Sequence, residues 1–300
     1  MSSPRNTIGH GLTKDAGWLD GVANAFGALV TGVYKIPGTA GLKSLLHGTW
    51  PLNHPLHPAI TDATVGGYTA MVFLDIVYLV AREPGVARAA DLLLVASFVT
   101  SLGAIVTGLT DWNDTYAEER RNGMLHGLIN VTATIGFLIS LWLRVGADLR
   151  EAGIVVGIVS WLVLTVGAYL GGEMVFGYGT QVNRQAWNEV GRKWQKLDVA
   201  ANGLEDRKPV VGRTKDGVDI FVAKLDGTIF AIANVCTHAG GPLNEGTFVG
   251  KDRCEIQCPW HGSRFCVKDG AAKAGPATFD EPSFETRVNE AGFVEVRPRG

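Results

Sequence analysis

The sequence is poor in cysteine and in charge, and both shortages limit what the protein can be. Only four of its 300 residues are cysteine, too few for the disulfide framework of a small secreted domain, so nothing demands an oxidising compartment. Charged residues make up 19% of the chain, below the roughly 25% of ordinary soluble domains. Because 46% of the residues are hydrophobic, this shortage of charge predicts a membrane portion.

An excess of charge of one sign is also missing. The net charge is only −2, which gives no reason to expect a nucleic-acid partner.

Residues 1–17 contain neither a twin arginine nor an apolar run after a basic start, so we expect no cleavable signal peptide. The length leaves room for about two domains.

Two of the cysteines stand in mixed dyads with histidine, as Cys236-x-His238 and Cys258-x-x-His261. Two thiolates and two imidazoles are what a Rieske [2Fe–2S] centre requires, with two Cys on one iron and two His on the other. A single zinc ion accepts the same four ligands. Zinc modules, however, usually pair Cys with Cys and His with His, so the mixed dyads favour the cluster. No paired histidine accompanies the other two cysteines, which we interpret as buried thiols: Cys254 and Cys266.

At these residues the chain resembles the Rieske ferredoxin family, over roughly residues 196–300. The resemblance implies an all-β domain in which Cys236 and Cys258 ligate the buried iron, while His238 and His261 ligate the solvent-facing iron. It also implies that Ser263 hydrogen-bonds the cluster.

Two departures from the family pattern are informative. Gly241 and Trp260 occupy the positions where respiratory relatives carry a disulfide, so that bridge cannot form here. Phe265 replaces a tyrosine that donates a hydrogen bond near the cluster. Losing that hydrogen bond favours the oxidised form. We therefore predict a potential toward the low end of the Rieske range of about −150 to +300 mV.

Four apolar runs, near residues 59–81, 90–109, 124–145 and 152–176, precede this domain. Each is close to the roughly 20 residues that span a hydrocarbon core, and small residues are frequent in all of them. The expected fold class is an N-terminal all-α four-helix transmembrane bundle followed by a C-terminal all-β Rieske-type domain. The expected domains are an N-terminal segment (1–41), a membrane domain (42–180), a linker helix (181–195) and the Rieske domain (196–300).

Apolar residues spaced three to four apart predict an amphipathic helix over 16–34, which either lies in the membrane interface or packs on the bundle. An even number of spans places both termini on one side. Lys and Arg are more numerous in the segments on that side, which favours cytoplasmic termini. We therefore expect a multi-pass protein of the cell membrane, in contact with lipid, whose Rieske domain is cytoplasmic.

The membrane half carries three short motifs: His-Pro-Leu-His-Pro at 54–58, Gly-Leu-Thr-Asp-Trp at 108–112 and His-Gly-Leu-Ile-Asn at 126–130. At these residues the chain resembles a bacterial family of four-helix membrane domains of unknown function, often fused to a Rieske domain in actinobacteria. This second resemblance covers roughly residues 42–184 and names no activity.

Three histidines of this half are candidate site residues, namely His54, His57 and His126. An imidazole in or near lipid is costly unless it is paired, which makes it a functional candidate. One hypothesis is a haem or quinone site that uses His126 with either His54 or His57. The alternative is that these histidines cap helices and hydrogen-bond Asp62, Asp111 or backbone carbonyls. We expect His10 and His47 at the surface.

These features favour a membrane-anchored carrier of single electrons, which takes them from a donor such as a reductase and passes them to an unidentified oxidoreductase. A quinone- or haem-linked membrane oxidoreductase is an alternative, and a redox sensor is another, although the signalling appendages of a sensor are not seen. A self-contained Rieske oxygenase is not expected. It needs a further iron site with two histidines and a carboxylate, and no histidine follows Cys266.

Overall fold

The computed structural model describes residues 7–299, so the start of the expected polar lead, residues 1–6, lies outside the described residues. The chain forms two compact units. The first unit contains the chain up to Ala40 and Leu56–Thr180. The second unit contains Gly41–Pro55 and Gln181–Gly300. The membrane domain expected over 42–180 includes residues 42–55. The segment instead belongs with the β-rich unit, because Ser44 and Thr49 hydrogen-bond the backbone of Gly275.

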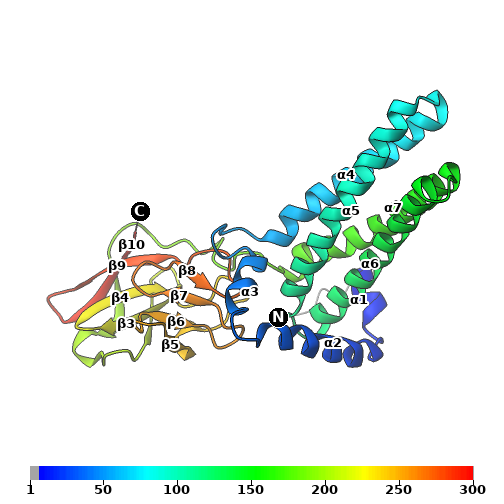
Figure 1. Ribbon diagram of the computed structural model, residues 1–300. Helices are drawn as coiled ribbons and strands as arrows, with labels where there is room; N and C mark the ends of the chain where they lie inside the picture. The colour runs from blue at the N-terminus through cyan, green and yellow to red at the C-terminus, as the bar shows by residue number, and fades with distance from the viewer. Residues whose placement is uncertain (1–6, 300) are drawn as a thin grey trace. The chain divides into compact units, whose positions relative to one another are not determined.

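The first unit is helical, and four of its helices are long and apolar enough to cross a membrane. Figure 1 shows that α4 runs beside α5 and that α6 runs beside α7. The predicted four-helix bundle is therefore confirmed. The elements of this unit are α1 (Ile8–Thr13), α2 (Trp18–Tyr34), α4 (Leu56–Ala81), α5 (Pro84–Trp112), α6 (Ala117–Val145), α7 (Arg150–Glu173) and the short π-helix η1 (Met174–Tyr178).

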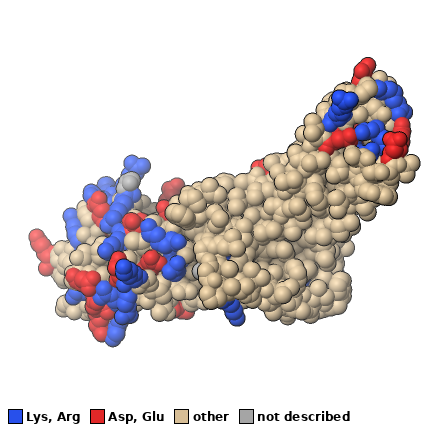
Figure 2. All heavy atoms as spheres, viewed as in Figure 1, with Lys and Arg blue, Asp and Glu red and all other residues tan. Residues whose placement is uncertain are grey.

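The surface of the long helices is suited to lipid. In Figure 2, charged side chains gather at the end where α4 meets α5 and α6 meets α7, and the visible helix surface behind that end is almost free of them. Large apolar side chains of the four long helices are exposed, including Phe73, Leu92, Ile135 and Val159. An apolar surface of this extent is covered by lipid in a membrane domain.

The two helical hairpins, α4–α5 and α6–α7, are related by an internal repeat. Tyr68 of α4 stacks on Phe137 of α6 with ring centroids 3.6 Å apart. Seven residues further along each helix, Asp75 of α4 meets Arg144 of α6 at 2.6 Å. Both pairs are separated by the same number of residues along the chain. Equivalent positions of α4 and α6 therefore face each other across an approximate two-fold axis.

The second helices of the hairpins follow the same pattern. A Cβ added at Gly67 would meet the Ser97 hydroxyl, and one added at Gly136 would meet the Ser160 hydroxyl. The number of residues between Ser97 of α5 and Ser160 of α7 equals the number between other equivalent positions of these two helices. Small residues at these contacts let the helix backbones approach closely.

Helix α2 confirms the amphipathic helix expected near 16–34. Leu19 and Ala23 are buried on the bundle, and Asp20 pairs with Arg121 at 2.5 Å. The opposite face exposes apolar side chains, with Trp18 and Leu29 about two-thirds accessible. Packing on the bundle thus leaves a second apolar face, as an interfacial helix requires.

The second unit is built mainly from two antiparallel sheets. The larger sheet has the strand order β1-β10-β9-β4-β3-β2 and the smaller has the order β5-β6-β7-β8. Its elements are α3 (Ala40–His47), β1 (Gln195–Ala200), η2 (Ala201–Gly203), β2 (Val210–Arg213), β3 (Asp219–Leu225), β4 (Thr228–Ala233), η3 (Leu243–Glu245), β5 (Thr247–Val249), β6 (Glu255–Gln257), β7 (Arg264–Cys266), β8 (Ala272–Ala274), β9 (Ser283–Val288) and β10 (Phe293–Pro298).

The prediction of a linker helix over 181–195 is wrong, because this segment forms only turns and extended chain. Contacts with the β-rich unit explain the difference. The Arg184 amide donates to the Thr237 carbonyl at 3.0 Å, and the Gln185 side chain donates to the Val235 carbonyl. These bonds replace those of a helix, since tertiary contacts override a weak local pattern.

Candidate iron–sulfur centre and membrane histidines

Each cysteine–histidine dyad lies in a tight turn with the same hydrogen bonds. The Cys236 carbonyl accepts from the Gly240 amide at 2.9 Å, and the Cys258 carbonyl accepts from the Gly262 amide at 3.1 Å. Both glycines have positive φ, +87° and +77°, which glycine adopts without a steric penalty. The first turn follows β4, and the second joins β6 to β7. Two matching turns therefore present one Cys and one His each.

The turns bring the four predicted ligands together. Cys236 and Cys258 are buried, with free thiols that hydrogen-bond to each other. The His238 and His261 rings are half-buried, with centroids 4.7 Å apart and planes at 85°. Two imidazoles at neighbouring positions of one iron, each with its nitrogen about 2 Å from the metal, place their ring centres roughly 5 Å apart.

This arrangement fits a two-iron cluster better than a single zinc ion. A tetrahedral zinc site draws four donor atoms to one point. Within residues 7–299, no three His, Cys, Asp or Glu side chains converge in that way. A sulfur pair and an imidazole pair instead match the two irons of a Rieske centre.

The sulfur pair also has a distinct acid–base character. The hydrogen bond with Cys258 and burial raise the pKa of Cys236 well above its ordinary value. The same hydrogen bond lowers the pKa of Cys258 to about 7. Metals bind the thiolate form, so ligation releases protons from this pair.

Residues around the turns are closely packed. Ser263 is fully buried, and its hydroxyl accepts from the Ala277 amide at 3.1 Å. Phe265 is also fully buried. A Cβ at Gly241 would lie 2.7 Å from the Cys258 sulfur and 3.0 Å from the Trp260 ring. Because of this close approach, the backbone at Gly241 has no room for a side chain.

Sequence reasoning missed one buried acid beside the first turn. A Glu281 carboxylate oxygen accepts from the Thr237 amide at 2.6 Å, between the ligands Cys236 and His238. Burial raises the pKa of Glu281 well above its usual range. The carboxyl group fixes the turn through its backbone, and no local pattern around residue 281 indicated this role.

The other two cysteines lie outside the ligand set. Cys266 is buried, as predicted, and burial raises its pKa. Cys254 is only half-buried. Both remain free thiols.

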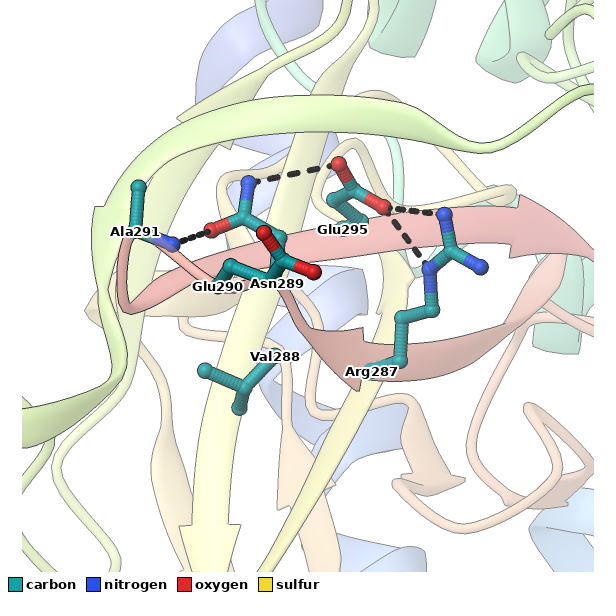
Figure 3. A pocket seen from close by; sticks show the side chains of 6 residues that line it. All are labelled: Arg287, Val288, Asn289, Glu290, Ala291 and Glu295. Carbon is teal, nitrogen blue, oxygen red and sulfur yellow. Dashed lines mark hydrogen bonds and ion pairs between the residues drawn. The ribbon is translucent and has the colours of Figure 1, made fainter.

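A surface hollow of about 540 Å³ lies at the hairpin between β9 and β10 (Figure 3). Three of its polar side chains pair with one another, since Glu295 accepts from Arg287 at 2.7 Å and from Asn289 at 3.3 Å. None of the cluster ligands lines this hollow, so it is not part of the candidate centre. The lining residues are Arg287, Val288, Asn289, Glu290, Ala291 and Glu295.

Two of the three membrane histidines face each other in the helical unit. His57, in the first turn of α4, and His126 of α6 have ring centroids 6.3 Å apart. Each ring hydrogen-bonds a backbone carbonyl, that of Ala104 at 2.9 Å and that of Gly167 at 2.8 Å. His54 belongs to the other unit and is exposed.

The other histidines differ from the surface positions that we expected. His47 is fully buried, so the prediction for this residue is wrong. It ends α3, in the segment that packs on the β-rich unit, and this packing was not visible in the sequence. His10 is half-buried and pairs with Glu118.

A paired Cys–His centre on a β-rich unit, joined to a bundle of membrane-length helices, defines an iron–sulfur protein with a membrane domain. Residues 53–184 match the family described as "Predicted membrane protein (DUF2231)", and residues 193–285 match the Rieske [2Fe-2S] domain. The ferredoxin component of the naphthalene 1,2-dioxygenase system of Pseudomonas putida is 30% identical over 32% of this chain and 88% of its own length. The corresponding component from Pseudomonas aeruginosa is 32% identical over the same shares.

The chain therefore belongs to the Rieske [2Fe–2S] ferredoxin family and carries a DUF2231 membrane domain ahead of its Rieske domain. The predicted fusion and the predicted [2Fe–2S] cluster are confirmed. Among solved structures, the ferredoxin of carbazole 1,9a-dioxygenase from Nocardioides aromaticivorans is 26% identical, with a TM-score of 0.32. It covers 36% of this chain and 99% of its own.

Proposed function

We propose that this protein is a membrane-anchored Rieske ferredoxin that carries single electrons from a reductase to an oxidoreductase partner. The observation that carries this proposal is the pair of matching turns, which place two cysteines in the interior and two histidines at a half-exposed edge. Relatives named as ferredoxin components of dioxygenase systems support the same role. When bound, the cluster supplies a one-electron couple.

The protein surface at the second turn is suited to brief contact with a partner. Trp260 stands next to the ligand His261 and is 51% exposed. Exposed tryptophans are unusual on a protein surface and are enriched among residues that dominate binding energies. We therefore assign Trp260 to the docking surface, close to the histidine edge through which electrons pass.

The membrane domain holds the carrier at the bilayer, with the Rieske domain on the cytoplasmic side. Four membrane-length helices and the Lys and Arg distribution support this placement. Gly241 and Trp260 leave no extra cysteine pair for a disulfide between the ligand turns, which agrees with a reducing compartment.

Electron transfer from a purified NADH-dependent ferredoxin reductase of a dioxygenase system tests this function. Stopped-flow bleaching of the cluster should be fast and second-order with the full-length protein in detergent. We expect Trp260→Ala to slow the reaction about tenfold, equivalent to about 1.4 kcal/mol, at unchanged cluster content. Trp187→Ala, another exposed tryptophan, is the matched control and should react normally. A cluster that stays oxidised with every such reductase, yet is reduced by dithionite, would contradict a reductase-fed carrier.

One observation favours the second candidate function, a haem- or quinone-linked membrane oxidoreductase. His57 and His126 face each other between the hairpins, as two groups of one site do. We propose them as a second redox site.

A further inference from the structure

We infer that His57 and His126 are the two axial ligands of a haem bound on the internal two-fold axis of the membrane domain. This inference specifies the second candidate function and does not depend on the iron–sulfur cluster. It starts from the positions of the two histidines. They are separated by the same number of residues as Tyr68 from Phe137, and as Asp75 from Arg144. All three pairs therefore lie on the axis, and only the histidine pair consists of metal ligands.

The hydrogen bonds fix the same tautomer in both rings. Nδ1 of His57 lies 2.9 Å from the Ala104 carbonyl, and Nδ1 of His126 lies 2.8 Å from the Gly167 carbonyl. A carbonyl oxygen only accepts, so each Nδ1 carries the proton and each Nε2 keeps its lone pair. Metal-binding histidines are oriented by just such a bond from the non-ligating nitrogen.

Helices α5 and α7 build the two ring sites in the same way. Ala104 and Gly167, which supply the carbonyls, are equivalent in the repeat, and so are Gly108 and Gly171 one turn later. A Cβ at Gly108 would lie 2.7 Å from the His57 ring, and one at Gly171 would lie 2.9 Å from the His126 ring. Each imidazole is thus held against a glycine, which restricts its orientation.

The proposed ligating nitrogens have at most one weak partner within the protein. Among the described residues, Nε2 of His57 makes no hydrogen bond, and Nε2 of His126 has only the Asn130 amide at 3.5 Å. Both rings are half-buried, so a ligand can reach them. A purely structural histidine would need only its carbonyl bond and would not require the same orientation twice.

The separation of the rings matches one metal ion between them. Two imidazoles on opposite sides of a metal, each nitrogen about 2 Å from it, place their ring centres roughly 6 Å apart. The observed separation is 6.3 Å, and the ring planes lie at 87°. Imidazoles on adjacent positions of one metal would be closer, as at the cluster site, where the centroids are 4.7 Å apart.

The surroundings favour haem over a bare ion. Within the described part of the chain, no further His, Cys, Asp or Glu joins this pair to form a three-ligand site. The remaining coordination positions must therefore come from the bound group, and a porphyrin supplies four in one plane. Haem is also largely apolar, and helical bundles hold cofactors on side chains of facing helices.

Haem analysis of the full-length protein, purified in detergent and titrated with hemin, tests the inference. We expect one haem per chain with a low-spin spectrum. The nearly perpendicular imidazole planes predict a strongly anisotropic low-spin ferric EPR signal. Absence of stoichiometric haem binding, or binding of copper in place of haem, would overturn the inference.

Variants locate the site and separate it from the cluster. His57→Leu and His126→Leu should each lose at least nine-tenths of the bound low-spin haem, while their Rieske EPR signal is retained. His57→Met keeps a haem ligand and should bind haem at a raised potential, which a structural role does not predict. Loss of haem in the control His54→Leu, with retention in His57→Leu, would contradict the ligand assignment. Cys258→Ser should remove the cluster and leave the haem. The ferredoxin proposal and the haem proposal can therefore fail independently of each other.

Discussion

At the scale of single residues, Gly241 determines how closely the two ligand turns approach. A Cβ there would lie 2.7 Å from the Cys258 sulfur, a distance that real Cβ contacts do not reach, and the nearby Trp260 ring limits any shift. We predict that Gly241→Ala lowers the cluster content at least tenfold, measured as iron and acid-labile sulfide per chain. Gly203→Ala is the control, because a Cβ at Gly203 meets nothing within 4 Å. Equal cluster contents in the two variants would show that the turns are looser than described.

The reduction potential tests the role of Phe265. Its fully buried ring occupies the position of the family tyrosine, whose hydroxyl is a hydrogen-bond donor. A hydrogen bond of about 1.4 kcal/mol to the reduced cluster corresponds to about 59 mV for one electron. Phe265→Tyr should therefore raise the midpoint potential by about that amount in an EPR-monitored titration, whereas Phe265→Leu should not. A titration that places the natural protein near the upper Rieske limit would refute the low-potential prediction.

The sequence indicates four candidate ligands, which the structure brings together, but it gives little sign of the residues that support them. Mixed Cys–His dyads at short spacing match the ligand set of a Rieske centre, so Cys236, His238, Cys258 and His261 can be proposed from the sequence alone. Glu281 approaches the first turn from a distant part of the chain, and nothing in its own neighbourhood indicates that contact. His47 is buried by a segment whose packing partner follows much later in the sequence. Both depend on long-range contacts, which a local pattern does not contain.

At the scale of elements, a buried ion pair joins α4 to α6. Arg144 binds Asp75 through two hydrogen bonds, at 2.6 and 2.7 Å, and both side chains are fully buried. Asp91 stands 3.5 Å from the same guanidinium. This pair occupies the two-fold axis, so it aligns the hairpins with each other.

Removing one charge of this pair should destabilise the bundle. Asp75→Asn leaves the Arg144 charge only partly compensated, and breaking a buried pair costs about 3–5 kcal/mol. We predict a clear drop in the thermal unfolding temperature of the detergent-solubilised protein. Replacement of both partners by leucine removes the uncompensated charge and should recover most of that loss. If the double variant were as unstable as Asp75→Asn, the pair would stabilise the bundle by more than charge compensation.

The membrane helices are predictable because their length and apolarity are set by the bilayer. The runs expected near 59–81, 90–109, 124–145 and 152–176 all lie within the observed helices. The segment over 181–195 failed as a helix because its spacing of apolar residues is a weak local signal. Backbone bonds to the β-rich unit, such as that from Arg184 to Thr237, determine its course instead.

At the scale of the whole molecule, the chain joins a duplicated membrane hairpin to a single Rieske domain. The repeat is present in the sequence, where His57 and His126, Gly67 and Gly136, and Ser97 and Ser160 recur in order. Few residues are identical between the two hairpins, so the sequence alone does not reveal the repeat. The repeat is recognised only when the structure shows the equivalent residues in contact.

The orientation in the membrane follows from the charge distribution and is a prediction for the complete protein. We expect the Rieske domain on the cytoplasmic side, because Lys and Arg are concentrated on the side of the termini. Protease added to inverted membrane vesicles should release a fragment carrying the Rieske domain, whereas protease added to intact spheroplasts should not. The reverse pattern would place the domain outside the cell.

EPR spectroscopy of membranes that contain the full-length protein, before and after dithionite reduction, tests whether the chain is a membrane-bound carrier of a [2Fe–2S] cluster. We predict a rhombic Rieske signal that appears only on reduction and stays with the membrane fraction. Cys236→Ser or His261→Ala should abolish it, and Cys266→Ser should leave it unchanged. A protein that shows no such signal and contains one zinc ion bound by the same four residues would refute the assignment of an iron–sulfur cluster.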